Sequence, residues 1–386
     1  MRDVAIIGAG PAGLTTARIL ASSGHDVVVL EEHGEVGVPV HCTGVLGLDA
    51  FSEFPLPAHA ILGTAHTATF VAADGSSVSV DAQRATAAVV DRAAFDQGLA
   101  DASLAAGADL RRGARVRAIE IGTSRVSIAL DGGARVDARS CVLACGANYR
   151  FNRQLGLGVP RSFVQSAQLE RAFEGPSTVE VHLGRDVAPG GFAWAVPFQR
   201  DGRPHTRIGL MCESRALAYF RRFATRLADR FAAPPASWPD PRLKILPLGP
   251  VSKTYASRLL AVGDAAGLVK PTTGGGIYYS LVSGRIAAET LDEALKADDL
   301  RDTRLRRYEA QWRERLGSEI RIGLAFRTLA SRMNDRAIDA VIELARIDGL
   351  VPMLRETADF NWHRQSALAL LKHAQFRRIV IASLWS

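Results

Sequence analysis

The sequence is poor in cysteine, and its few cysteines are badly spaced for shared chemistry. Only four occur in 386 residues, at positions 42, 141, 145 and 212. A chain of this length buries about three quarters of its unfolded surface, so it needs no disulfide framework to hold a core. None of the four forms the C-x-x-C spacing of zinc and thioredoxin-like sites. We therefore expect reduced cysteines and no metal.

Long apolar runs are also lacking. No segment approaches the roughly 18 consecutive apolar residues of a membrane-spanning helix. The first apolar strand begins at Val4, which leaves no room for a signal peptide before it. Hydrophobic residues make up 47% of the chain and charged residues 23%, as in an ordinary globular protein. With about 150 residues per domain, these features predict a soluble, cytoplasmic protein of two or three domains.

Basic residues outnumber acidic ones, but only near the C-terminus. The net charge is +7, and residues 301–386 hold 16 Arg and Lys against 10 Asp and Glu. This excess has two interpretations, which are solvated helix faces or attraction to the anionic inner face of a membrane. Aromatic residues do not interleave with these arginines in any nucleic-acid motif, so we expect no nucleic-acid partner.

A glycine-rich motif lies close to the N-terminus. Residues 4–8 form a buried apolar strand, G-A-G-P-A-G follows at 8–13, and a helical pattern runs on to Gly24. A second apolar strand, residues 27–30, ends in two glutamates. This arrangement is typical of a dinucleotide site, in which glycines let a pyrophosphate approach a helix N-terminus and the acid binds ribose. A carboxylate there repels a 2′-phosphate, which disfavours NADP. The predicted site residues are Gly8, Gly10, Pro11, Ala12, Gly13, Glu31 and Glu32.

A second glycine-rich constellation follows about 250 residues later. The apolar run 259–262 ends at G-D-A-A-G (263–267), and P-T-T-G-G-G (271–276) opens a long helical pattern. Together with P-V-H-C-T-G (39–44) and D-R-A-A-F-D (91–96), these motifs resemble the FAD-dependent geranylgeranyl reductase family, within the p-hydroxybenzoate hydroxylase-like flavoproteins. The resemblance covers about the first 300 residues.

The resemblance implies FAD as the cofactor and particular residues around it. Asp264 would hold the ribityl chain, and a helix beginning near Gly274 would aim its N–H groups at the pyrimidine edge of the flavin. That agrees with the negative charge of reduced flavin, which a helix N-terminus stabilises. Arg92 would lie against the ribityl or phosphate region. The cofactor residues implied in this way are Cys42, Arg92, Val116, Gly146, Gly263, Asp264, Gly274, Gly275, Gly276 and Ile277.

The fold class implied is α/β, with a doubly wound Rossmann-like FAD-binding domain, an inserted antiparallel-sheet substrate domain and C-terminal helices. Alternating apolar and polar residues in 162–212 indicate the antiparallel sheet. The helices are indicated by apolar stripes in 301–386. We divide the chain into an FAD-binding domain (1–58, 84–155 and 244–298), a substrate domain (59–83 and 156–243) and a C-terminal helical region (299–386).

The reacting face is expected to combine a thiol with aromatic side chains. The family places a cysteine beside the flavin, which corresponds to Cys42, with His41 next to it. The segment 191–197 resembles the family's Tyr-x-Trp-x-Phe-Pro motif and implies substrate contacts from Phe192, Trp194 and, from the later motif, Pro271. Phe192 and Val196 depart from this pattern, and Met211 stands where the family has a later glycine.

These residues predict reduction of carbon–carbon double bonds in a prenyl or other apolar substrate by hydride from reduced FAD. Hydroxylation by a flavin monooxygenase and quinone-linked electron transfer are the alternatives. Because the first lysine of the chain is Lys244, the lysine that flavin halogenases need before the Trp-containing motif is missing. The segment 144–147 lacks the family's Asp-Gly, so the electron donor, NAD(P)H or a reduced protein carrier, stays open.

Overall fold

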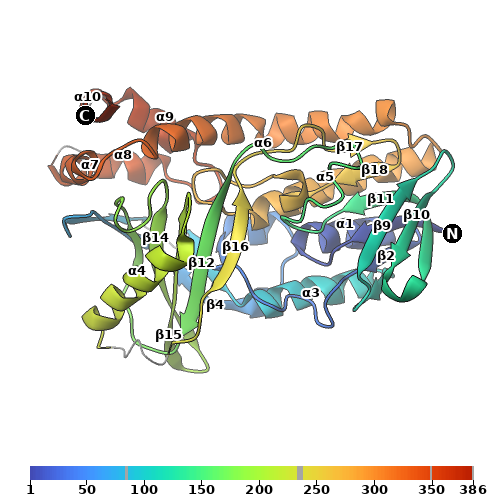
Figure 1. Ribbon diagram of the computed structural model, residues 1–386, viewed down its shortest axis with the longest axis horizontal. Helices are drawn as coiled ribbons and strands as arrows, with labels where there is room; N and C mark the ends of the chain where they lie inside the picture. The colour runs from blue at the N-terminus through green and yellow to red at the C-terminus, as the bar shows by residue number, and fades with distance from the viewer. Residues whose placement is uncertain (83–85, 233–237, 348–349, 385–386) are drawn as a thin grey trace.

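A computed structural model describes residues 1–82, 86–232, 238–347 and 350–384. It has an elongated outline, with one lobe built around each of two large sheets and a row of helices along one long side (Figure 1). No helix within these ranges is both long and apolar enough to cross a bilayer.

The first lobe contains the N-terminal strands. Its sheet has the order β17-β18-β11-β1-β2-β8, and the pairs from β18 to β8 are parallel. The strands β1 and β2 are almost completely buried, as the continuous apolar runs predict. A doubly wound sheet is therefore confirmed. Its strands are β1 (Arg2–Ile7), β2 (Val27–Leu30), β8 (Asp109–Arg111), β11 (Arg135–Leu143), β17 (Tyr255–Ala256) and β18 (Leu259–Ala261), with β9 (Val116–Ile121) and β10 (Val126–Leu130) as an antiparallel extension from β11.

Three helices cover this sheet. The first, α1, packs against both other helices of the lobe, and α5 is predominantly apolar and mostly buried. They are α1 (Pro11–Ser22), α3 (Arg92–Ala105) and α5 (Ile277–Lys296), with short 3₁₀ turns η2 (Asp131–Gly133) and η4 (Gly263–Ala266).

The second lobe is a seven-stranded sheet in the order β16-β12-β15-β14-β13-β5-β6. All its pairs are antiparallel except β13 with β5. Because side chains alternate along a strand, one face of the sheet packs on α4 and the other packs with residues that include Val89 and Leu324. The elements are β5 (Thr67–Val71), β6 (Ser77–Asp81), β12 (Phe163–Arg171), β13 (Val179–His182), β14 (Phe192–Arg200), β15 (Arg203–Cys212), α4 (Ala216–Arg230) and β16 (Arg242–Pro247).

A small three-stranded sheet lies between the segments of the two lobes. In it β7 (Ala87–Val90) pairs with both β3 (Val45–Gly47) and β4 (Ile61–Ala65). The helix α2 (Asp49–Glu53) and the 3₁₀ turn η1 (Ala58–Ala60) lie between β3 and β4 in the chain. The strand β16 pairs with β12 in the second lobe, so the expected domain boundary at 244 falls inside a strand.

The tail is helical, as predicted. Its longest helix, α6, runs beside α5 along the length of the molecule (Figure 1). One side of α6 is buried in the core of the first lobe through Leu305, Tyr308, Trp312 and Leu316. The short helices that follow α6 in the chain form a separate apolar cluster. The tail helices are α6 (Asp302–Ala330), α7 (Asp335–Ile347), α8 (Leu350–Thr357), α9 (Arg364–Lys372) and α10 (Ala374–Leu384).

Candidate functional site

The turn between β1 and α1 requires glycine at two positions. Gly8 has φ +107°, and a Cβ there would lie 2.5 Å from the carbonyl oxygen of Ala144. A Cβ at Gly13 would lie 2.2 Å from the carbonyl oxygen of Gly8. Pro11 occupies the first position of α1, where its missing N–H costs nothing. The motif is therefore fixed by backbone packing within the protein.

Gly10 and Gly146 are different, because they border open space. A Cβ at either glycine would meet no atom within 4 Å. Both follow parallel strands, β1 and β11, so they lie at the carboxyl edge of the sheet where such folds bind ligands. No side chain of the described residues caps the N-terminus of α1 beside Gly10. The edge thus offers uncapped N–H groups and room beside them, which fits a pyrophosphate.

The two glutamates that follow β2 also lie at this edge of the sheet. Glu31 is buried, and its carboxylate accepts hydrogen bonds from the Ala9 N–H (2.8 Å) and from His33. It therefore fixes the glycine turn itself, and its ribose contact stays a prediction. Glu32 is more exposed and pairs with Arg115. The side chain of Val116 is buried in the core, so only its backbone is left for a ligand.

The second glycine motif lies directly beside the first. A Cβ at Gly263 would crowd Ser280 and Ala12, and a Cβ at Gly284 would lie 2.6 Å from the carbonyl oxygen of Ala12. Glycine at these positions lets α1, η4 and α5 approach closely. Two motifs that are about 250 residues apart in the sequence thus border one region.

The second helix begins three residues after Gly274, near which its start was predicted. Gly274 has φ +69°, Gly276 is the N-cap, and α5 begins at Ile277. Consecutive glycines have the weakest helix propensity after proline, which explains the delay. A Cβ at Gly276 would lie 2.6 Å from Oδ1 of Asp264, so this carboxylate lies against the turn.

The Cys42 loop contacts a buried ion pair. Arg92 donates to both carboxylate oxygens of Asp96 (2.8 and 2.7 Å). Burial disfavours the charge of Arg92, but Asp96 and the nearby Cys42 thiol outweigh it and raise the pKa of Arg92. Among the described residues, its buried Nε has no hydrogen-bond partner. The Cys42 Sγ itself accepts from the Gly44 N–H at 3.4 Å.

Across from this loop lies the apolar face of the second sheet. Trp194 is 9% exposed, and its ring packs at a centroid distance of 5.7 Å from Phe192. Its indole N–H has no hydrogen-bond partner in the part of the chain that the structure describes. Gly209 pairs with Trp194 in the sheet, and a Cβ there would fall 2.4 Å from the indole. Met211 pairs with Phe192, and its Sδ would lie 3.4 Å from a Cβ at Gly274. The apolar face therefore reaches the glycine turn.

Pro271 is buried against α6. Its ring would meet a Cβ at Gly323 at 3.2 Å, and its carbonyl accepts from Arg327 at 3.4 Å. Its predicted substrate contact stays a prediction, and the structure assigns it a packing contact.

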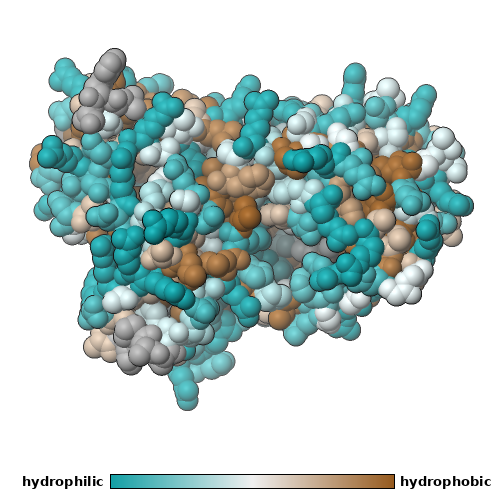
Figure 2. All heavy atoms as spheres, in the orientation of Figure 1, coloured by the Kyte–Doolittle hydropathy of each residue, from teal (hydrophilic) through white to brown (hydrophobic). Residues whose placement is uncertain are grey.

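Lys244, on β16, joins the two sides of this region. Its Nζ lies 3.8 Å from Oδ2 of Asp264. Burial, together with the charges of Lys244, Arg242 and His33, lowers the pKa of His41, which keeps this imidazole neutral at pH 7. Figure 2 shows a hollow in this face between the apolar atoms over β16 and the lobe that carries β9 and β10.

Sequence reasoning missed Arg207. This side chain is 1% exposed, pairs with Glu170, and donates to the carbonyl oxygens of Thr43 (2.6 Å) and Val90 (2.8 Å). It ties the second sheet to the Cys42 loop. The sequence offered one indication of this role. Arg207 lies two residues before Gly209, and side chains two residues apart share one face of a strand.

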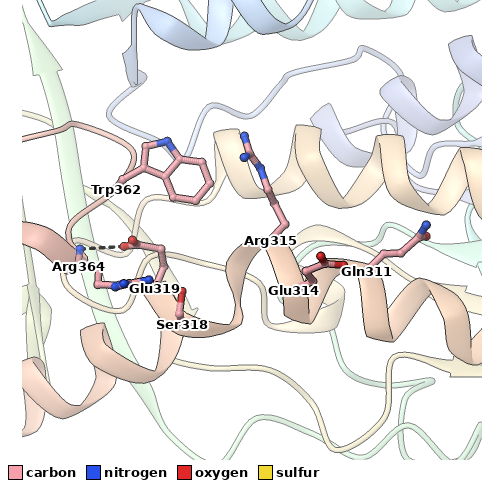
Figure 3. A pocket seen from close by; sticks show the side chains of 7 residues that line it. All are labelled: Gln311, Glu314, Arg315, Ser318, Glu319, Trp362 and Arg364. Atoms are coloured by element: carbon pink, nitrogen blue, oxygen red, sulfur yellow. Dashed lines mark hydrogen bonds between the residues drawn. The ribbon is translucent and has the colours of Figure 1, made fainter.

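A further pocket lies outside this region. It has a volume of about 550 Å³ between α6 and the loop before α9, and its wall includes Arg315, Glu319 and Trp362 (Figure 3). Among the residues that the structure describes, no cluster of His, Cys, Asp and Glu is suited to a metal, and all four cysteines are free.

Comparison with known proteins identifies relatives along most of the chain. A family model described as pyridine nucleotide-disulphide oxidoreductase matches residues 2–158. The digeranylgeranylglycerophospholipid reductase of Methanosphaerula palustris is 30% identical over 88% of both chains. The enzyme of the same name from Methanocaldococcus jannaschii is 28% identical over 88% of this chain and 90% of its own.

Solved structures show the same fold. A geranylgeranyl bacteriochlorophyll reductase-like protein from Thermoplasma acidophilum superposes with a TM-score of 0.83 at 21% identity, covering 99% of both chains. Halogenase PltM, solved in complex with FAD, gives 0.68 at 17% identity, covering 100% of this chain and 91% of its own. With its glycine cradle, its thiol loop and this likeness along most of its length, the chain belongs to the FAD-dependent geranylgeranyl reductase family.

Proposed function

We propose that this protein saturates carbon–carbon double bonds of a prenyl or similar apolar lipid. The observation that carries the proposal is the placement of an apolar sheet face, with Trp194 and Met211, directly against the Gly274 turn. The names of the relatives, digeranylgeranylglycerophospholipid reductases, support a long isoprenoid substrate. An apolar wall beside a redox cofactor excludes water and suits a substrate without polar groups.

Distinct groups of residues would hold FAD. Gly10 and the first turn of α1 would take the pyrophosphate, Glu31 the ribose, and Asp264 the ribityl chain. The N-terminus of α5, which no side chain within the described ranges caps, would face the pyrimidine edge of the ring. When bound and reduced, FAD supplies a hydride from N5.

The reaction also needs a proton donor. Saturation of one double bond takes one hydride and one proton, added to neighbouring carbons. Cys42 is our candidate for the donor, because it lies on the loop beside the Arg92–Asp96 pair and Arg207 fixes that loop to the apolar sheet. Solvent would return the proton to the thiol afterwards. Trp194 would orient the lipid, since its ring forms part of the wall.

The test is anaerobic reoxidation. The purified yellow protein is reduced with dithionite, excess reductant is removed, and unsaturated lipids of different headgroup and chain length are added. We expect an isoprenoid lipid to restore the oxidised flavin spectrum, with a product that is two hydrogens heavier for each double bond. A product that gains one oxygen in air would instead identify a monooxygenase. Reoxidation by ubiquinone alone would identify an electron-transfer flavoprotein.

Association with a membrane follows from the substrate, and one surface suits it. Phe163, Leu243 and Ile245 are 37%, 54% and 55% exposed on the outer face of β12 and β16, where α4 leaves the sheet uncovered; we name them the apolar ridge. Figure 2 shows apolar atoms gathered near the middle of one face, around the position of β16 in Figure 1. Phe163 packs on Tyr149, whose hydroxyl donates to the Asp264 carbonyl, so the ridge borders the cofactor site.

Charge favours an anionic bilayer over a second copy of the chain as the occupant of this ridge. The exposed residues Arg161, Arg222 and Arg226 lie on or beside the same outer face, and none pairs with a carboxylate in the described part of the chain. Each basic residue near an anionic leaflet contributes about 1 kcal/mol of attraction. Two copies facing each other through this surface would bring like charges together.

Vesicle flotation checks this surface. We expect wild-type protein to float at low salt with phosphatidylcholine vesicles that contain phosphatidylglycerol, and less with phosphatidylcholine alone. Leu243→Asp with Ile245→Asp should weaken binding by roughly tenfold for each half-exposed side chain removed from the bilayer. Ile381→Asp, on the exposed face of α10, is the matched tail control. Equal loss in both variants would contradict the ridge, and loss only in the tail variant would assign docking to the tail.

A further inference from the structure

The glycine turn that borders the flavin site encloses a buried lysine. Lys270 is 5% exposed, and its Nζ donates to the carbonyl oxygen of Phe360 at 2.7 Å and lies 4.3 Å from the centre of the Phe360 ring. No carboxylate oxygen in the described chain lies within ion-pair distance of this ammonium. Acidic residues act on it only from further away. They are Asp49, Asp359 and Glu319.

The turn holds the lysine directly beneath its glycines. The Lys270 N–H donates to the Gly275 carbonyl at 3.0 Å, and the Gly274 N–H donates to the Lys270 carbonyl at 2.8 Å. A Cβ at Gly275 would lie 2.8 Å from Cε of Lys270 and 3.4 Å from Nζ. The lysine side chain therefore folds back under the backbone of Gly275, and the charge cannot move away without opening the turn.

The C-terminal tail supplies the carbonyl oxygen of Phe360, which accepts the hydrogen bond from the Lys270 ammonium. Burial, and after it the charge of Lys270, lowers the pKa of His363 to about 3 and leaves its ring neutral. The ring contacts both Thr272 and the Phe360 carbonyl. Asn361 donates to Asp49 of α2, and the Arg364 N–H donates to Glu319 of α6 at 2.9 Å, the contact drawn in Figure 3. Residues 359–364 are thus anchored on three sides of the turn.

A buried ammonium without a close counterion is costly. Burial alone is the main reason why the pKa of Lys270 falls to about 8. A hydrophobic side chain of similar length would avoid this cost. Such a buried charge is advantageous where a negatively charged ligand binds close to it.

We propose that Lys270 stabilises the negative charge of reduced FAD from beneath the Gly274–Gly276 turn, with the tail segment 359–364 as its support. Two-electron reduction with uptake of one proton at N5 leaves one negative charge on the N1–C2 carbonyl region of the ring. In the proposed function this region faces the turn, so the inference rests on that binding mode. Lys270 would not contact the flavin directly. Its positive charge would act across the backbone of the turn, which makes Lys270 a positioning residue.

The test measures the midpoint potential of bound FAD in Lys270→Gln, Lys270→Met and Lys253→Gln. Glutamine keeps a donor for the Phe360 carbonyl without the charge, methionine removes both, and Lys253 is a surface lysine paired with Asp302. We expect both Lys270 variants to lose about tenfold in their preference for reduced over oxidised FAD, a fall of about 30 mV for this two-electron couple. Lys253→Gln should leave the potential unchanged.

Thermal unfolding of the apoproteins separates a structural role. Because the lysine is buried at a cost, Lys270→Met should unfold at the same temperature as wild type or higher. An unchanged potential in both FAD-loaded Lys270 variants would overturn the inference, as would a lowered unfolding temperature with wild-type potential. The potential is measured without lipid, so the inference can fail while lipid-driven reoxidation succeeds, and the reverse.

Discussion

Replacing Gly10 by alanine gives a folded protein that binds FAD poorly. Gly10 has φ −86° and ψ 178°, which alanine adopts without strain, and the added Cβ meets no protein atom within 4 Å. The methyl group instead enters the space beside the N-terminus of α1, where the pyrophosphate approaches the backbone. Loss of two charge-assisted hydrogen bonds at roughly 1.5–3 kcal/mol each raises the dissociation constant by about 100-fold or more.

Fluorescence titration of the apoprotein with FAD measures this change. Gly317→Ala on α6 is the matched control, since a Cβ there makes only an ordinary 3.7 Å contact with Arg313. Gly13→Ala is the contrasting variant, because its Cβ would collide with the Gly8 carbonyl and lower the unfolding temperature as well. Tight FAD binding by Gly10→Ala would show that the pyrophosphate lies elsewhere.

Cys42→Ala should retain its flavin and lose its reductase activity. The thiol lies beside the Arg92–Asp96 pair, and its removal leaves the cofactor cradle and the apolar sheet intact. Loss of a positioned proton donor slows turnover by about 100- to 10,000-fold. The rate of lipid-driven reoxidation under anaerobic conditions measures the effect, with the flavin spectrum as the check on loading.

The matched control is Cys212→Ala. This thiol is buried on the other face of the sheet, toward α4, and its Sγ donates to the Ser214 carbonyl at 3.1 Å. Its loss should leave the reoxidation rate within about twofold of wild type, because the substitution removes one sulfur far from the apolar wall. A Cys42→Ala enzyme that reoxidises at the wild-type rate would assign the proton to another donor or to water.

The doubly wound sheet could be predicted because its signals are local. Buried apolar runs, each followed by a glycine turn, occur at β1 and β18, and the helices α1 and α5 follow in their expected order. The alternation in residues 162–212 predicted β12 to β15 for the same reason.

Contacts between segments that are far apart in the chain could not be predicted from the sequence. The positions of Arg207 and Lys244 depend on the register of β12 with β15 and β16, which strand patterns alone leave open. The packing of Pro271 on α6 and of Phe360 on Lys270 joins segments that are about 50 and 90 residues apart. No local rule predicts that the tail returns to a turn in the cofactor domain.

The length of α6 has a mechanical consequence. Its first half is embedded in the core of the nucleotide-binding lobe, and its far end reaches the substrate sheet, where Arg327 donates to the carbonyl oxygens of Gly190 and Pro271. A continuous helix of 29 residues that is attached to both lobes resists hinge motion between them. Any opening of the site for a substrate is therefore expected to come from local segments rather than from rotation of whole lobes.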